Sequence, residues 1–202
     1  MVVLVLINVL VFLYQITLPQ PALQAFITHW GIIPDVPRLT PLLTAMFLHG
    51  GWFHLIGNMW VLWVFGRNVE DTAGSGRFLA FYLACGLVAS IGHTVFNPYS
   101  RIPMVGASGA IAGVMGGFLL LYPKAYIDTI VFLLFIFRLA VPAPFFLIYW
   151  FILQLFSGVG SLTEINYAGG GTAWFAHVGG FIAGMALIKI LGRRKRQTWL
   201  VT

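Results

Sequence analysis

The sequence predicts an all-α membrane protein, folded as one domain of six transmembrane helices. Of its 202 residues, 60% are hydrophobic and 8% are charged, whereas a soluble domain carries about 25% charged residues. A chain this apolar cannot cover its surface with polar side chains, so membrane lipid must surround it. Six apolar stretches each approach the roughly 20 residues that a bilayer core requires.

The first predicted span covers residues 2–18 and ends before Pro19. It lacks a basic start and a small-residue cleavage site, so we interpret it as a retained helix and not as a signal peptide. Residues 19–41 contain five prolines and are expected to form a long, irregular, partly interfacial loop. The apolar stretch 42–48 is expected to lie shallow in the membrane. The second span, residues 51–71, is counted back from a charged cluster that ends it.

The four remaining predicted spans are residues 77–96, 105–122, 142–157 and 173–191. The apolar run 126–157 is too long for one span and is interrupted by Arg138, so the part before residue 142 is expected to lie shallow or to pack against the bundle. Residues 158–172 are rich in glycine and are expected to form a mobile loop that acts as a lid. A short basic tail, residues 192–202, follows the last span.

The basic residues orient the bundle. With both termini in the cytoplasm, only Arg38 and Arg101 of the eleven basic residues lie outside. Cytoplasmic loops of membrane proteins carry the excess of Lys and Arg, so this orientation is favoured, in a prokaryotic inner membrane. The basic run in the tail is therefore a topology signal, and no nucleic-acid partner is expected. The cytoplasmic set is Arg67, Arg77, Lys124, Arg138, Lys189, Arg193, Arg194, Lys195 and Arg196.

Four polar residues on three predicted helices share one level near the outer face. Ser108 and His177 lie three and four residues into their spans, about 5–6 Å deep at 1.5 Å per residue. His54 and Asn58 lie in the first two turns of the second span, and their i, i+4 spacing places them on one helix face. Polar groups inside a membrane tend to face the bundle interior or a water-filled cavity, and they mark functional sites.

These residue types match acyl-transfer chemistry. A serine hydroxyl needs a base to take its proton, and a neutral histidine is suited to that role near pH 7. Ser108 is the candidate nucleophile and His177 the candidate base, while His54, Asn58 and the Ser108 backbone N–H are candidate oxyanion donors. The five acids, which are Asp35, Glu70, Asp71, Asp128 and Glu164, all fall in loops or on the inner side. The sequence therefore predicts a Ser-His dyad and not a triad.

Other interpretations of the same residues remain open at this point. A lone serine in a membrane helix commonly bonds back to its own helix, and His54 with Asn58 could be interhelical hydrogen-bonding groups. His49 and His93 also lie near the outer side, but no H-E-x-x-H occurs, so no metal site is expected. A small transporter is disfavoured because the polar residues gather at one level instead of tracing a path through the bilayer.

Stripes of small residues mark the two helices that carry the dyad. Such stripes let helix backbones approach closely in lipid, so these two helices are expected to pack against each other. They comprise Gly106, Gly109, Gly113 and Gly117 on one helix and Ala176, Gly180 and Gly184 on the other.

Four motifs, in order along nearly the whole chain, resemble those of the prokaryotic, six-helix rhomboid intramembrane serine proteases: "HGGWFHLIGN", "GRNVED", "GASGA" and "AHVGGFIAG". The resemblance implies Ser108 as nucleophile, His177 as base, and His54 and Asn58 assisting at the oxyanion. It also implies cleavage of single-span membrane proteins near the outer end of their helix, with no metal or cofactor. Arg38 lies somewhat upstream of the family's Trp-Arg pair, so no role is assigned to it.

The main alternative is a non-catalytic rhomboid-like protein that binds client transmembrane helices. Such relatives typically lack the nucleophile or the base, and this chain has both Ser108 and His177. The sequence leaves the physiological substrate, the cut site and the oligomeric state open.

Overall fold

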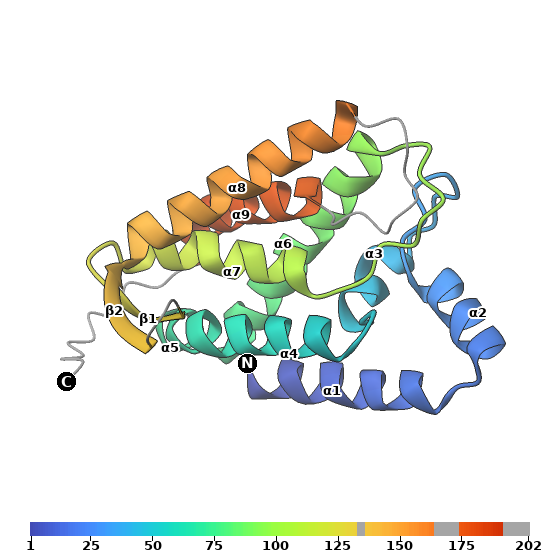
Figure 1. The fold of residues 1–202 in the computed structure, drawn as a ribbon, viewed down its shortest axis with the longest axis horizontal. Coiled ribbons are helices and arrows are strands. Elements are labelled where there is room, and N and C mark those ends of the chain that lie inside the picture. Colours follow the sequence, from blue (N-terminus) through green and yellow to red (C-terminus); the bar gives the residue numbers. More distant parts are fainter. Residues whose placement is uncertain (133–135, 164–173, 192–202) are drawn as a thin grey trace.

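The computed structural model describes residues 1–132, 136–163 and 174–191, which form a mostly helical bundle with one two-stranded sheet (Figure 1). The helical elements are α1 (Val2–Thr17), α2 (Gln20–Trp30), α3 (Pro41–Thr44), the 3-10 turn η1 (Ala45–Phe47), α4 (Trp52–Val61), the π segment η2 (Leu62–Gly66), α5 (Arg67–Ala73), α6 (Ser75–Phe96), α7 (Ser108–Leu121), α8 (Ala143–Thr163) and α9 (Trp174–Leu191). The strands are β1 (Tyr126–Phe132) and β2 (Ile136–Pro142).

Helix α7 forms the centre of the bundle. Every residue from Gly109 to Phe118 is buried, and Figure 1 shows α7 between α4 on one side and α8 and α9 on the other. Large aromatic side chains of α6, Phe78, Phe81 and Tyr82, complete the core beside it. A helix that is apolar all round is suited to this fully enclosed position.

Glycines bring α7 and α9 into backbone contact. A Cβ atom added at Gly180 would meet the Gly109 carbonyl oxygen, and one added at Gly184 would meet that of Gly113. The predicted packing of the two stripes is therefore confirmed at these four positions. Gly106 instead faces α4 and Gly117 faces Phe81 and Ile188, while Gly116, which is not in the predicted stripe, meets the Phe181 carbonyl oxygen.

Helix α1 has an apolar outer face and buries two polar side chains beside Leu4 and Phe12, unlike a helix on a soluble protein, which exposes its polar face. Asn8 and Gln15 are buried on the face that it turns to the bundle. The outer face carries large apolar side chains, which are stable there only in contact with lipid. They are Val2, Val3, Leu6, Ile7, Leu10, Leu13, Tyr14 and Ile16.

Within the described ranges, α6 and α9 are long and apolar enough to cross a membrane, while α1, α7 and the segment Ala143–Leu153 are shorter apolar helices. The second predicted span, residues 51–71, corresponds to a continuous helical stretch in which η2 joins α4 to α5 and which extends to Ala73. The count of six transmembrane helices stays a prediction.

The expectation of an irregular loop at residues 19–41 is wrong for its first half, which forms α2. Pro19 is the N-cap of this helix and Pro21 lies in its first turn. Proline is tolerated there because the first N–H groups of a helix have no intrahelical partner. The two prolines therefore mark a helix start. Residues 42–48, which were expected to lie shallow in the membrane, include most of α3 and all of η1. Met46 in this segment is buried.

The all-α prediction is corrected by the hairpin of β1 and β2. The strands pair antiparallel from Tyr126 opposite Pro142 to Phe132 opposite Ile136. The β-branched residues Ile127, Thr129 and Val131 favour a strand over a helix. Backbone bonding continues into α8, because the Ala143 N–H donates to the Ala125 carbonyl at 2.8 Å.

The fifth predicted helix, 142–157, is longer in the structure, where α8 runs to Thr163. Residues 158–163 of the predicted lid are thus helical. The rest of that segment and the predicted basic tail lie outside the described residues.

Candidate active site

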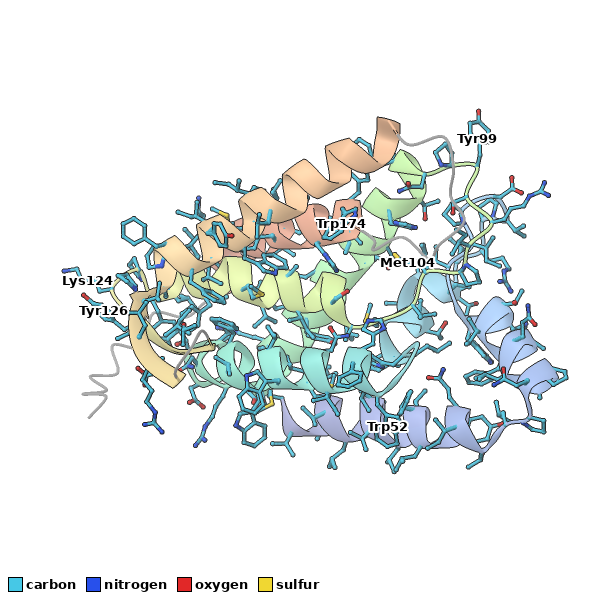
Figure 2. The ribbon with its side chains drawn as sticks, in the orientation of Figure 1. Trp52, Tyr99, Met104, Lys124, Tyr126 and Trp174 are labelled. Atoms are coloured by element: carbon cyan, nitrogen blue, oxygen red, sulfur yellow. The ribbon has the colours of Figure 1, made fainter. Side chains whose placement is uncertain are left out.

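Ser108 is the first residue of α7. The loop before it is held in place by backbone hydrogen bonds at Met104 and Gly106. Ile32 and Met104 exchange backbone hydrogen bonds of 3.0 and 2.8 Å, and the Gly106 N–H donates to the Ala45 carbonyl at 2.9 Å. Figure 2 labels Met104 in this loop, beside the start of α7. The loop residues thereby set the position of the Ser108 side chain.

Two features of the structure require glycine at position 106. Its φ of +126° lies in the left-handed region, which residues with a side chain rarely adopt. A Cβ atom there would also lie 2.6 Å from Nε2 of His54. The turn before Ser108 thus brings its backbone directly against the ring of His54.

The Ser108 hydroxyl lies 2.7 Å from Nε2 of His177, across the α7–α9 contact. His177 is buried, and Ser108 is half-buried. The imidazole ring is flanked by Trp150 of α8, at 5.9 Å between ring centroids, and by Trp174, edge-on at 6.3 Å. These indole rings restrict the imidazole orientation. Neither tryptophan was predicted as a site residue. Trp150 is distant in the chain from every residue that was, whereas Trp174 lies one helical turn before His177, a spacing that could have identified it.

His54 and Asn58 lie one turn apart on α4 and face the same space. The Gly50 N–H lies 3.4 Å from Nδ1 of His54, an arrangement that leaves the ring proton on Nε2, the atom nearest the loop before Ser108. Nδ2 of Asn58 donates to the His54 carbonyl at 2.9 Å, which orients the amide and leaves its second N–H for another acceptor.

The side chain of His49 packs against the ring of His54. Gln15 of α1 holds the His49 backbone by two bonds, donating to its carbonyl at 3.1 Å and accepting from its N–H at 3.0 Å. The two imidazole rings meet edge to face at 5.0 Å. Burial, with the nearby His54 as a smaller cause, lowers the pKa of His49 to about 4, so the ring is neutral at pH 7. Gln15 was missed, although its spacing of seven from Asn8 in an apolar span indicates a packed polar face.

All four predicted site residues, Ser108, His177, His54 and Asn58, line one cleft of about 860 Å³. Its walls come from α4, η2, α7 and α8, with Trp174 and His177 of α9 at the same end as Ser108 and residues of β1 at the other. The walls are mainly apolar and aromatic: Phe53, Trp60, Val61, Val64, Phe65, Ile111, Met115, Ile127, Phe146 and Trp150. Such a cleft suits an apolar segment held against a few polar groups.

Arg38 and His93 do not line this cleft. Arg38 donates to the carbonyl of Thr28, a residue of α2, at 2.5 Å. His93 is buried on α6 and contacts Asn97, whose Nδ2 lies 3.4 Å from its Nδ1.

A rhomboid domain model matches residues 37–194, which include Ser108, His177, His54 and Asn58. The chain belongs to the rhomboid family. Rhomboid proteins are embedded in membranes, in agreement with the apolar outer face of α1 and the two long apolar helices.

Several curated proteins are similar to this rhomboid chain. Rhomboid protease GluP of Bacillus subtilis is 51% identical over 78 residues, covering 39% of this chain and 15% of that protein. RHOMBOID-like protein 6, mitochondrial, of Arabidopsis thaliana is 31% identical over 165 residues, covering 78% and 45%. The human presenilin-associated rhomboid-like protein, mitochondrial, is 32% identical over 115 residues, covering 54% and 29%. The chain therefore matches less than half the length of each of these relatives.

Proposed function

We propose that this protein is an intramembrane serine endopeptidase that cleaves single-span membrane proteins near the outer end of their transmembrane helix. The observation that carries the proposal is the 2.7 Å contact between the Ser108 hydroxyl and Nε2 of His177, in a mainly apolar cleft of about 860 Å³. Similarity to a relative named as a rhomboid protease supports it.

In the proposed reaction, the Ser108 Oγ attacks the scissile carbonyl carbon while its proton passes to Nε2 of His177. The tetrahedral intermediate then collapses, the C–N bond breaks, and His177 returns the proton to the leaving amine. A water molecule, deprotonated by the same Nε2, hydrolyses the acyl-enzyme and restores the free hydroxyl. The flanking indole rings of Trp150 and Trp174 keep the imidazole in line for both transfers.

Three donors are available to the developing oxyanion. Ser108 begins α7, so its backbone N–H has no intrahelical acceptor and lies at the positive end of the helix dipole. The Nε2–H of His54 and the free N–H of Asn58 face the same cleft. Fixed donors in a site walled by apolar side chains stabilise developing charge more than water does.

We place the protein in the membrane with six spans, both termini cytoplasmic and the dyad near the outer face. The charge asymmetry supports this: Arg67, Arg77 and Lys124 lie at the end of the bundle where α5 and α7 finish, while the Arg101–Asp35 ion pair lies beyond the opposite end. The similarity to a bacterial relative supports a prokaryotic cell membrane.

The test is cleavage of a single-span substrate by the purified chain in lipid vesicles, with the fragments identified by mass spectrometry. Ser108→Ala should abolish cleavage, and His177→Asn should lower it by about 10²–10⁴-fold, the usual contribution of a general base. Ser75→Ala, an exposed serine at the start of α6, is the matched control and should cleave normally. Cleavage that persists in Ser108→Ala would refute the proposal; binding of substrate helices without any cleavage would favour the non-catalytic alternative.

A further inference from the structure

A buried glutamine of α1 binds the backbone segment that precedes His54. Gln15 is 1% exposed, and its side-chain amide makes two hydrogen bonds to the backbone of His49. Its Nε2 donates to the His49 carbonyl at 3.1 Å, and its Oε1 accepts from the His49 N–H at 3.0 Å. The buried side of α1 is therefore joined to the loop from which α4 begins.

The carbonyl that Gln15 binds and the N–H that His54 accepts belong to one peptide group. This group, the His49–Gly50 peptide, is trans, and its N–H lies 3.4 Å from Nδ1 of His54. A trans peptide group is planar, with its C=O and N–H pointing to opposite sides. When Gln15 fixes the direction of the carbonyl, it also fixes the direction of the N–H toward the His54 ring. A carbonyl that accepts a hydrogen bond also polarises the N–H of the same group, which strengthens the second bond.

The His49–Gly50 peptide would be free to rotate without Gln15. Its N–H belongs to Gly50, which is exposed and is followed by Gly51, and glycine adopts many more backbone conformations than other residues. A rotated peptide would direct its N–H away from the His54 ring and toward solvent, where water can accept the bond. The Gln15 amide therefore selects one of several accessible orientations.

This orientation decides which nitrogen of His54 carries the ring proton. A neutral imidazole has one N–H and one acceptor nitrogen. With the Gly50 N–H at Nδ1, the proton is on Nε2, the atom that faces the loop at Gly106 directly before Ser108. This tautomer gives the cleft a ring donor for the oxyanion, and the other tautomer does not. Catalytic hydrogen bonds are often long in the free enzyme and shorten during the reaction, which agrees with the 3.4 Å separation.

We propose that Gln15 is a positioning residue for the oxyanion site. Through the His49–Gly50 peptide it keeps the His54 ring in the Nε2–H tautomer, directed into the cleft. This inference rests on the proposed proteolytic function. Among the residues described as lining the cleft, none belongs to α1, so Gln15 acts through His54 and not on the substrate.

The first test compares Gln15→Met with Asn8→Leu, using one single-span substrate in lipid vesicles. Both variants remove a buried polar side chain of α1, but Asn8 donates to the Leu4 carbonyl of its own helix, at 2.7 Å. Gln15→Met should lower kcat by about 10- to 100-fold with KM unchanged, a part of the 10²–10³-fold that loss of a whole oxyanion donor costs. Asn8→Leu should keep the wild-type kcat. Melting curves give the folded fraction by which each rate is corrected.

A double-mutant cycle separates positioning from loss of structure. His54→Ala leaves no ring to orient, so adding Gln15→Met to it should change kcat by less than about twofold. A purely structural role of Gln15 would lower kcat by the same factor in both backgrounds. Gln15→Asn, whose amide is one methylene shorter, gives the same comparison if Gln15→Met does not fold.

Nitrogen-15 NMR of the histidine rings in detergent reports the tautomer without requiring cleavage. The His54 signals are those lost in His54→Ala. The wild type and Asn8→Leu should carry the proton on Nε2 of His54, whereas Gln15→Met should show both tautomers.

Two results would overturn the inference alone: equal loss of kcat in the two backgrounds of the cycle, or the wild-type tautomer of His54 in a folded Gln15→Met protein. A wild type that cleaves no single-span substrate would overturn the proposed function. The tautomer comparison would in that case still decide whether Gln15 orients the His54 ring.

Discussion

Replacing Gly180 with alanine should separate the two helices that carry the dyad. A Cβ atom at this position would lie 3.0 Å from the Gly109 carbonyl carbon and would overlap its oxygen, whereas carbon atoms pack at about 3.5–4.0 Å. Because both close atoms belong to the backbone, no side chain can rotate away. The helices must move apart by roughly 0.5–1 Å to relieve the carbon–carbon contact alone, and by more than that to clear the oxygen.

The displacement acts close to the chemistry, since Gly109 follows Ser108 directly and Gly180 lies one helical turn from His177. Lengthening the 2.7 Å contact between Ser108 and His177 by 1 Å would break it as a hydrogen bond. Displacements of that size at reacting groups cost about 100-fold in rate. Overpacking should also lower the free energy of unfolding by about 1–3 kcal/mol, less about 1 kcal/mol for the better helix propensity of alanine.

The neighbouring glycine supplies the control. A Cβ atom at Gly179 would have its nearest neighbours at 3.8 and 3.9 Å, which is ordinary contact, so Gly179→Ala gains the same helix propensity without a clash. We expect Gly180→Ala to lose about 100-fold in cleavage rate and to melt earlier than Gly179→Ala in detergent. Equal rates in the two variants would refute the view that close backbone contact aligns the dyad.

Three further substitutions test other parts of the site. Asn58→Ala should lower kcat by about 10²–10³-fold, the usual cost of losing one oxyanion donor, and an unchanged kcat in a substrate titration would remove Asn58 from that role. Gly106→Ala should lower the free energy of unfolding by about 1–3 kcal/mol through backbone strain, and it should lower activity further because the new Cβ displaces the His54 ring. Gly76→Ala is the control, since a Cβ at Gly76 on α6 meets no other atom. Equal melting temperatures of the two variants would contradict the prediction. Gln15→Met should destabilise the protein by about 1–3 kcal/mol, because it leaves the buried backbone groups of His49 without partners, and a chemical unfolding curve identical to that of the wild type would count against it.

The parts of the fold that follow from local geometry could be predicted from the sequence. Helix periodicity places His54 and Asn58 on one face whatever surrounds them, and closely spaced glycines predicted the contact of α7 with α9. The positions of Ser108 and His177 in their predicted spans placed them at one depth in the membrane. Their contact could not be predicted, because it joins residues 69 apart in the chain and depends on how the whole bundle packs.

The predictions from the sequence were wrong where one residue type occurs in two different kinds of structure. Proline ends many helices, yet Pro19 and Pro21 begin α2. Apolar residues suit both membrane helices and strands, so the run after residue 125 did not reveal the hairpin of β1 and β2.

The central claim is that His177 activates Ser108, and labelling by a serine-reactive fluorophosphonate tests it most directly. The account predicts one covalent adduct on the native protein, located by peptide mass spectrometry at Ser108, absent in Ser108→Ala and strongly slowed in His177→Asn. An adduct on another serine, or labelling of His177→Asn at the wild-type rate, would contradict it.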